Sequence, residues 1–309
     1  MSIPKIDLED PRIAAGVKLY SRQALKAYEL VKCFDDAVRP VYAFDEGRKS
    51  VTHVGTGVLF TAGGELFLLS ASHVFDAVGT YQLLIGATDV LRPFKGDRFS
   101  SARGASGTHR DDPIDASVFH IIDPVPEDIR ASALQLSDLD LIGAARAPEF
   151  YVAAGFRVSQ SKSTSIGHTT ILDRYPTMEL DEAHYRHFKL DRERHLALAF
   201  EGQNLVNGRW QKSPSLRGFS GGAMFRIAGL SALLPSKEEA DRKVKLSAIL
   251  IEQKKAVRNK FESGVIGTRL GVHFHLIDTY LPELGFQQML HEAYEKQFPS
   301  ENKPLDSAR

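Results

Sequence analysis

Cysteine is almost missing from this 309-residue chain, in which Cys33 is the only one. A single cysteine excludes an intrachain disulfide, and with it the small extracellular scaffolds that depend on disulfide frameworks. The lack of disulfides favours a protein of a reducing compartment. We therefore expect a cytoplasmic protein.

An excess of charge of one sign and long apolar runs are also lacking. The chain has 39 Lys plus Arg and 39 Asp plus Glu, so no overall field would attract nucleic acid or an anionic membrane. No apolar run reaches the length of about 18 residues that a membrane-spanning helix needs. Residues 1–9 are polar and acidic, without the apolar core of a signal peptide. We expect no nucleic-acid partner and no membrane partner.

The residues that are present indicate many short strands between helical ends. The apolar residues of 10–36 recur at helical spacing, and from Val38 onward β-branched and aromatic runs alternate with Gly, Pro and Asp turns. This pattern of short strands separated by turns predicts an antiparallel barrel or sandwich. The candidate strands are 41–44, 51–60, 66–70, 81–85, 116–122, 150–154, 195–199, 245–251 and 272–277.

Two further segments have a distinct pattern. Residues 159–194 are polar and have no clear period, so we interpret them as a long surface insertion. Residues 283–298 are amphipathic and predict a C-terminal helix that Pro299 ends, followed by a flexible tail.

Three short segments carry the chemistry. They contain His73 within Leu69–Val74, Asp115 within Ile114–Val118, and Ser220 within Arg217–Gly222. A hydroxyl nucleophile needs an imidazole to take its proton and a carboxylate to hold the imidazole in the correct tautomer. Ser220, His73 and Asp115 supply these three groups. Asp111 and Asp112 are the alternatives for the carboxylate, because they lie in the adjacent polar turn.

These segments resemble the motifs of trypsin-like (chymotrypsin-fold) serine peptidases. Ser70-Ala71-Ser72-His73 is similar to the small-residue run that ends in the family's base, and Gly218-Phe219-Ser220-Gly221-Gly222 matches its Gly-x-Ser-Gly-Gly. The order His, Asp, Ser is that of the chymotrypsin arrangement. Asp115 follows His73 by 42 residues, and Ser220 follows Asp115 by 105. The chain resembles a bacterial-type intracellular member without disulfides.

The resemblance implies an all-β fold of two antiparallel six-stranded β-barrels. The first barrel, residues 38–140, would carry the base and the carboxylate, and the second, residues 141–277, would carry the nucleophile and the 159–194 insertion. Residues 1–37 would form an N-terminal helical extension, and residues 278–309 a C-terminal helix and tail.

The resemblance also implies a serine endopeptidase acting on polypeptides through an acyl-enzyme. Ser220 would attack the scissile carbonyl, His73 would transfer the proton, and Asp115 would orient His73. The backbone amides of Gly218 and Ser220 would form the oxyanion hole. No cofactor and no metal are expected.

The chain departs from the family at two places. Phe219 stands where zymogen-activated members have an Asp that pairs with a freed N-terminus, so activation by cleavage is not expected. Pro214 corresponds to the base of the specificity pocket, and its neighbours Ser215, Leu216 and Arg217 would form the wall. Without an acidic residue at position 214, we expect a pocket for an uncharged, small or apolar side chain.

Two alternatives stay open at this stage. The chain is either a protease-fold binding or regulatory module that does not use catalysis, or a restricted processing enzyme that is latent until a protein partner orders the oxyanion loop. The His184 and His187 pair suggests a metal site, but the arginines around it favour a solvated surface.

Overall fold

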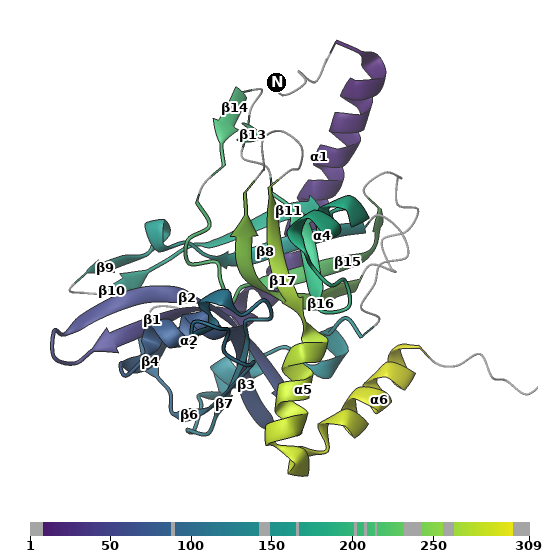
Figure 1. The fold of residues 1–309 in the computed structure, drawn as a ribbon. Coiled ribbons are helices and arrows are strands. Elements are labelled where there is room, and N and C mark those ends of the chain that lie inside the picture. Colours follow the sequence, from purple (N-terminus) through teal and green to yellow (C-terminus); the bar gives the residue numbers. More distant parts are fainter. Residues whose placement is uncertain are drawn as a thin grey trace, which may run out of the picture.

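Two curled antiparallel sheets make up most of the protein in the computed structural model, consistent with a double β-barrel fold (Figure 1). The structure describes residues 9–87, 90–141, 149–164, 167–200, 203–206, 209–213, 215–231, 243–255 and 263–298.

The first sheet has seven strands in the order β5-β4-β1-β2-β3-β7-β6. Gly63 and Gly64, both with positive φ, form the tight turn that joins the strands 50–62 and 65–71 into a hairpin. The strands are β1 (Val38–Asp45), β2 (Ser50–Ala62), β3 (Glu65–Ala71), β4 (Gln82–Ala87), β5 (Val90–Pro93), β6 (Gly96–Ser100) and β7 (Ala116–Ile121).

The second sheet has six strands in the order β11-β8-β15-β16-β17-β12. Its two edges approach each other where the Leu180 N–H donates to the Ala197 carbonyl at 2.8 Å, and this contact curls the sheet. The strands are β8 (Glu149–Phe156), β11 (Leu172–Met178), β12 (His195–Ala199), β15 (Ala223–Ser231), β16 (Lys243–Lys254) and β17 (Gly264–Arg269). Two separate hairpins pair β9 (Lys162–Thr164) with β10 (Gly167–Thr169), and β13 (Gln203–Val206) with β14 (Arg209–Lys212).

Helices cover both sheets, so the all-β prediction is wrong and the fold is mixed. The predicted strand 272–277 is part of a helix, α5 (Leu270–Tyr280). Leu270, Phe274 and Ile277 are buried at helical spacing, which the short apolar stretch concealed. The predicted C-terminal helix is confirmed as α6 (Phe286–Gln297). The remaining short elements are α2 (Ser72–Val78), η2 (His109–Asp111), α3 (Glu127–Ala131), η3 (Leu136–Asp138), η4 (Val158–Gln160) and η5 (Pro282–Leu284).

The segment 159–194 is not one surface insertion. It supplies β11 to the second sheet and α4 (Glu182–Phe188), whose Tyr185 is buried. Its polar residues misled the prediction because several of them pair within the fold. Arg174 of β11, for example, forms a bidentate ion pair with Asp35.

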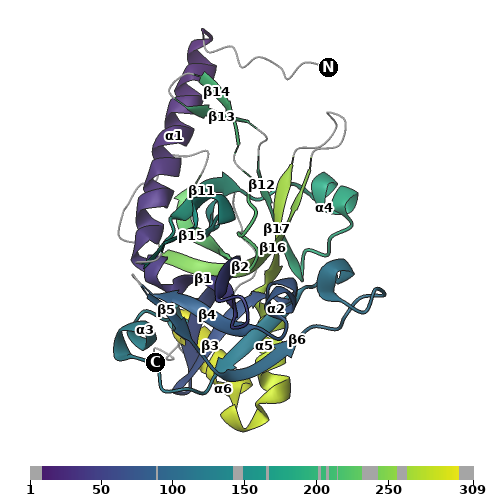
Figure 2. The ribbon, with the colours of Figure 1, turned by 90° about the vertical axis from the view of Figure 1, so that its left-hand side faces the viewer.

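The N-terminal extension is helical, as predicted, and lies against the second sheet. Asp10 caps α1 (Pro11–Val31) by accepting from the Arg12 N–H at 2.8 Å, and η1 (Lys32–Ala37) continues it. Figure 2 shows α1 running along the second sheet and extending beyond it. Tyr20 packs on Phe150 of β8, with ring centroids 5.1 Å apart.

The C-terminal helices lie instead against the first sheet (Figure 1). Phe286 is fully buried and contacts the rings of Phe60 in β2 and Phe274 in α5. A side chain at Gly63, in the β2–β3 turn, would come within 2.6 Å of Leu284. Each end of the chain therefore packs on the barrel that is more distant from it in sequence.

His273 on α5 is expected to make stability depend on pH. It is fully buried, with Nε2 donating to the Ser70 carbonyl at 3.3 Å, and burial lowers its pKa to about 4. The unfolded chain, with a histidine pKa of about 6.5, binds the proton more tightly, so stability falls as the pH drops from about 6.5 toward 4. This group alone should remove about 2 kcal/mol of unfolding free energy between pH 7 and pH 5.

Urea unfolding at both pH values measures this effect. His273→Leu should have the smaller loss between pH 7 and pH 5, whereas His275→Leu, on the exposed side of the same helix, should behave as the wild type. Equal losses in the wild type and His273→Leu would contradict the prediction.

Candidate active site

His73 lies at the start of α2, directly after β3. The Ser72 hydroxyl donates to the Ala116 carbonyl at 2.6 Å and fixes this junction to β7. Gly55 of β2 passes so close that a side chain there would come within 2.6 Å of Val74. The imidazole is 36% exposed, which leaves one edge open to solvent.

Asp115 is bonded to His73 at two points. His73 Nδ1 lies 2.5 Å from Asp115 Oδ2, and the His73 backbone N–H donates to Oδ1 at 2.9 Å. Because a carboxylate accepts, Nδ1 is the donor of this hydrogen bond, and in the neutral imidazole Nε2 is then the nitrogen that can accept a proton. Asp115 has φ of 47°, a left-handed conformation that Asp tolerates better than most residues and that places its carboxylate under the imidazole.

Asp115 is also buried, and burial raises the pKa of its carboxyl. The hydrogen bonds from His73 to the carboxylate oppose this rise, because they stabilise the charged form. A buried carboxylate whose charge is held mainly by one imidazole is suited to stabilise that imidazole when it becomes positively charged.

The two alternative carboxylates have other partners. Asp112 accepts from the Ile114 and Asp115 backbone N–H groups at 2.9 Å each and from the Ser101 hydroxyl at 2.5 Å. It therefore shapes the turn that presents Asp115. Asp111 is exposed and accepts from Ser106. Neither contacts His73.

Ser220 lies in a loop that requires glycine at the next position. Gly221 has φ of 85°, and a side chain there would come within 1.8 Å of the Thr56 carbonyl oxygen. The Ser220 hydroxyl donates to the Ile251 carbonyl at 3.2 Å and makes no hydrogen bond with His73. Both side chains nevertheless line the same cleft. The structure thus pairs two of the three predicted residues and places the third beside them.

The amides predicted to form an oxyanion hole have free N–H groups. The Arg217 carbonyl accepts from the Val158 N–H at 2.9 Å, so in the trans peptide the Gly218 N–H points the opposite way. The intervening Phe219 N–H donates to the Leu216 carbonyl at 2.9 Å. Within the described residues, neither Gly218 nor Ser220 donates its N–H to any acceptor.

Phe219 holds this loop through apolar packing. Its side chain is fully buried and packs on Tyr175, with ring centroids 5.6 Å apart. A side chain at Gly155 would come within 3.0 Å of the Phe219 ring. At position 219, where zymogen-activated trypsin-like peptidases have an Asp that forms an ion pair, this chain has a buried aromatic ring.

Contacts between the barrels fix both loops, and the sequence did not reveal them. Thr56 of β2 donates its N–H to the Ser220 carbonyl and its hydroxyl to the Gly218 carbonyl, each at 2.8 Å. In the other direction, His195 Nε2 of β12 donates to the Pro113 carbonyl at 2.9 Å, two residues before Asp115. Thr268 of β17 donates its hydroxyl to the carbonyl of Ile114.

The predicted pocket wall is only partly accessible. Leu216 is buried in the same apolar cluster as Phe219, so its side chain does not face a ligand. Ser215 and Arg217 are exposed, but neither lines the cleft that contains His73 and Ser220. Pro214 lies outside the described residues. The nature of the specificity pocket therefore stays a prediction.

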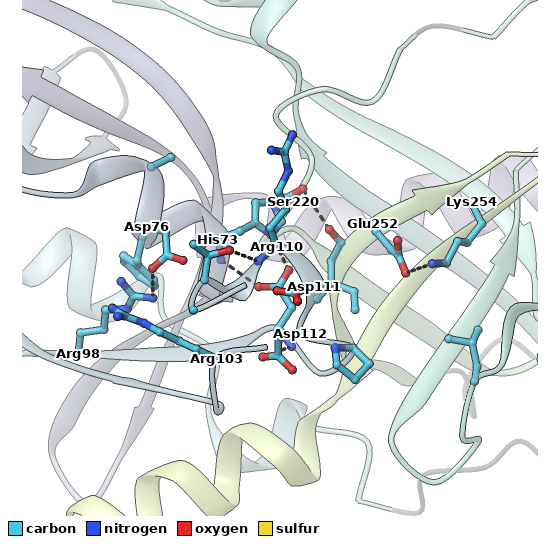
Figure 3. A pocket seen from close by; sticks show the side chains of 18 of the residues that line it. His73, Asp76, Arg98, Arg103, Arg110, Asp111, Asp112, Ser220, Glu252 and Lys254 are labelled. Carbon is cyan, nitrogen blue, oxygen red and sulfur yellow. Dashed lines mark hydrogen bonds and ion pairs between the residues drawn. The ribbon is translucent and has the colours of Figure 1, made fainter. Parts of the chain in front are cut away.

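The cleft between the barrels has a volume of about 1060 Å³ (Figure 3). Its walls come from α2, from the loop between β6 and β7, from the end of α4 and from β16. In Figure 3, His73, Asp76 and Arg98 lie on one side of Ser220, and the Glu252–Lys254 ion pair lies on the other.

Comparison with known protein families and curated proteins gives no match to this chain. None of the described helices is both long and apolar enough to span a membrane. Among the described residues no three His, Cys, Asp or Glu side chains gather as metal ligands, and His184 pairs with Asp181 at 2.6 Å.

Proposed function

We propose that the protein is a serine endopeptidase. The observation that carries the proposal is the His73–Asp115 pair, in which Nδ1 contacts the carboxylate while the imidazole lines the same cleft as Ser220. A base held in one tautomer by a buried carboxylate, beside a serine with free amides, is the arrangement that acyl transfer requires.

In the proposed reaction the Ser220 hydroxyl leaves the Ile251 carbonyl and turns to His73 Nε2. His73 takes its proton as Oγ attacks the scissile carbonyl, and the imidazolium is stabilised by Asp115. His73 then protonates the leaving amine, the C–N bond breaks, and an acyl-enzyme remains. Water, deprotonated by His73, releases the acid and restores the hydroxyl.

The negative charge on the carbonyl oxygen is proposed to be held by the Gly218 and Ser220 amides. One such donor is worth about 10²- to 10³-fold in turnover. Phe219 and the Val158–Arg217 hydrogen bond support a loop that is already in place without N-terminal cleavage.

A second candidate function is a latent or non-catalytic module with a protease fold. The observation in its favour is the Ser220 hydroxyl, which donates to Ile251 rather than to His73. In this alternative a partner protein would have to turn Ser220 toward the base before any chemistry occurs.

Labelling of the purified full-length protein with an uncharged fluorophosphonate separates the two candidates. The wild type and Ser215→Ala, an exposed serine of the same loop, should be labelled. Ser220→Ala and His73→Ala should not. An unlabelled wild type would reject the self-sufficient peptidase and favour the latent module.

His195 is expected to act as a positioning residue, because it holds the backbone before Asp115 from the other barrel. His195→Ala should slow labelling about 10- to 100-fold, the order expected when a reacting group is misplaced by about 1 Å. His195→Gln, whose amide can still donate to the Pro113 carbonyl, should recover most of the rate. If both variants lose the rate together with the fold, as judged by circular dichroism, the role is merely structural.

A further inference from the structure

The cleft that holds Ser220 and His73 is lined by equal numbers of acidic and basic side chains, but the two sets differ in their partners. Its five carboxylates are those of Asp76, Asp111, Asp112, Asp115 and Glu252. Its five Arg and Lys side chains are those of Arg98, Arg103, Arg110, Lys189 and Lys254. A charge that is already paired within the protein contributes little to ligand selection, whereas an unpaired one attracts the opposite charge.

Three of the carboxylates are engaged deep in the cleft wall. Asp115 accepts a hydrogen bond from His73, and Asp112 accepts one from the backbone N–H of Asp115. Asp76 accepts from Arg98 Nη2 and from His109 Nδ1, each at 2.9 Å. Burial alone would raise the pKa of Asp76, but these hydrogen bonds outweigh it and lower the pKa, so the carboxylate stays charged and paired.

The other two carboxylates are engaged at the cleft edge. Glu252 pairs with Lys254 at 2.6 Å, which also neutralises that lysine. Asp111 accepts from the backbone N–H and the hydroxyl of Ser106, a residue of its own loop. All five acidic groups therefore have donors within the protein, and two of them, Asp76 and Glu252, pair with an Arg or Lys side chain.

Three cations are left over, namely Arg103, Arg110 and Lys189, and we call them the basic rim. All three are exposed, and no described acidic side chain lies within ion-pair distance of any of them. They come from both barrels, since Arg103 and Arg110 belong to the loop between β6 and β7 and Lys189 follows α4. Among the exposed charged side chains that line the cleft, these three cations are therefore balanced by one carboxylate only, Asp111, whose donors are neutral.

The loop that carries the two arginines is anchored. His109, next to Arg110, is buried and bonds to Asp76 at one ring nitrogen and to the Ser101 carbonyl at the other. In Figure 3, Arg103 lies on the same side of Ser220 as His73 and Asp76, and Arg110 lies in the middle of the view, next to Ser220. The anchored His109 fixes the backbone beside Arg110, and the planar guanidinium of an arginine matches a carboxylate in two-point contact.

We propose that the cleft selects polypeptides with acidic side chains close to the bond that is cut, and that the basic rim recognises them. The proposal rests on the proposed peptidase function and adds its substrate class. Each rim contact is partly exposed to water, so each is expected to contribute about 2- to 5-fold in selectivity, and the three together about 10- to 100-fold.

The test compares two peptide libraries that are identical except for Glu or Gln at fixed positions on either side of the scissile bond. The wild type should cleave the Glu library about 10- to 100-fold faster at low salt, and the ratio should fall as salt is added. The triple variant Arg103→Glu, Arg110→Glu, Lys189→Glu should prefer the Gln library. Lys18→Glu, the same kind of charge reversal at a single exposed position of α1, should behave as the wild type.

The triple variant must still be labelled by the uncharged fluorophosphonate at the wild-type rate, which shows that the fold and the reacting groups are intact. Equal cleavage of both libraries by the wild type, or an unchanged ratio in the triple variant, would overturn the proposal. If no peptide is cleaved, the proposed function fails. Binding of the two libraries to Ser220→Ala then tests the basic rim without catalysis. Tighter binding of the Glu peptides would support acidic selection by the rim, and equal binding would overturn it.

Discussion

Asp115→Asn is expected to slow the labelling of Ser220 about 10⁴-fold. The oxygen of the new amide can still accept from the His73 backbone N–H. Its NH₂ group would face His73 Nδ1, and because two donors cannot share a hydrogen bond, the imidazole would move its proton to Nε2. The nitrogen that must take the Ser220 proton would then already be protonated.

The same substitution should not weaken the fold. Burial raises the pKa of Asp115, so the folded state binds the proton more tightly than the unfolded chain does. The free energy of unfolding therefore falls as the pH rises through the folded-state pKa and the buried carboxyl ionises. A neutral Asn avoids this penalty, and it accepts the left-handed φ of 47°. We expect the melting temperature at pH 7 to be unchanged or higher.

Labelling rates and thermal melts, measured on the same preparations, check both effects. Asp111→Asn is the matched control, since Asp111 lies in the same loop but has no contact with His73. A wild-type rate in Asp115→Asn, or an equal loss in Asp111→Asn, would reject Asp115 as the orienting carboxylate.

Phe219→Ala is expected to destabilise the protein by about 3–5 kcal/mol, the usual range for removing a buried phenyl ring. The ring fills the space between Tyr175 and the backbone at Gly155, so its loss leaves a cavity directly behind Ser220. The Gly218 and Ser220 amides would no longer be fixed, and labelling should fall more steeply than stability alone explains.

Urea unfolding measures the stability change, and labelling at a urea concentration well below the transition measures the rate. Phe219→Leu keeps most of the apolar volume and should lose much less of both. A Phe219→Ala protein that labels at the wild-type rate would mean that the loop is held by its backbone hydrogen bonds and not by the ring.

The sequence was sufficient for the features that depend on local pattern. The Gly-x-Ser-Gly-Gly turn and the small residues before His73 can be recognised because each constrains the backbone within a few residues. The same holds for the N-terminal helix, where Asp10 and Pro11 mark the start. The bond between His73 and Asp115 was predicted from the order and context of two such motifs.

The features that the sequence missed depend on partners far along the chain. Arg174 looked like a solvated residue because its partner, Asp35, is 139 positions away. His195 and Thr268 gave no local sign that they hold the loop before Asp115. The segment that forms α5 is short and apolar, and only its packing on the first barrel decides between helix and strand.

The crossed arrangement of the two chain ends bears on how the protein comes apart. The helix that precedes the first barrel packs on the second, and the helices that follow the second barrel pack on the first. If the chain were cut between the barrels, the first half would keep α1, which packs on the second barrel, and the second half would keep α5 and α6, which pack on the first. Each half would then expose the apolar face that the other half's helices normally cover. The two halves should therefore melt as a single cooperative unit, and neither should fold in isolation.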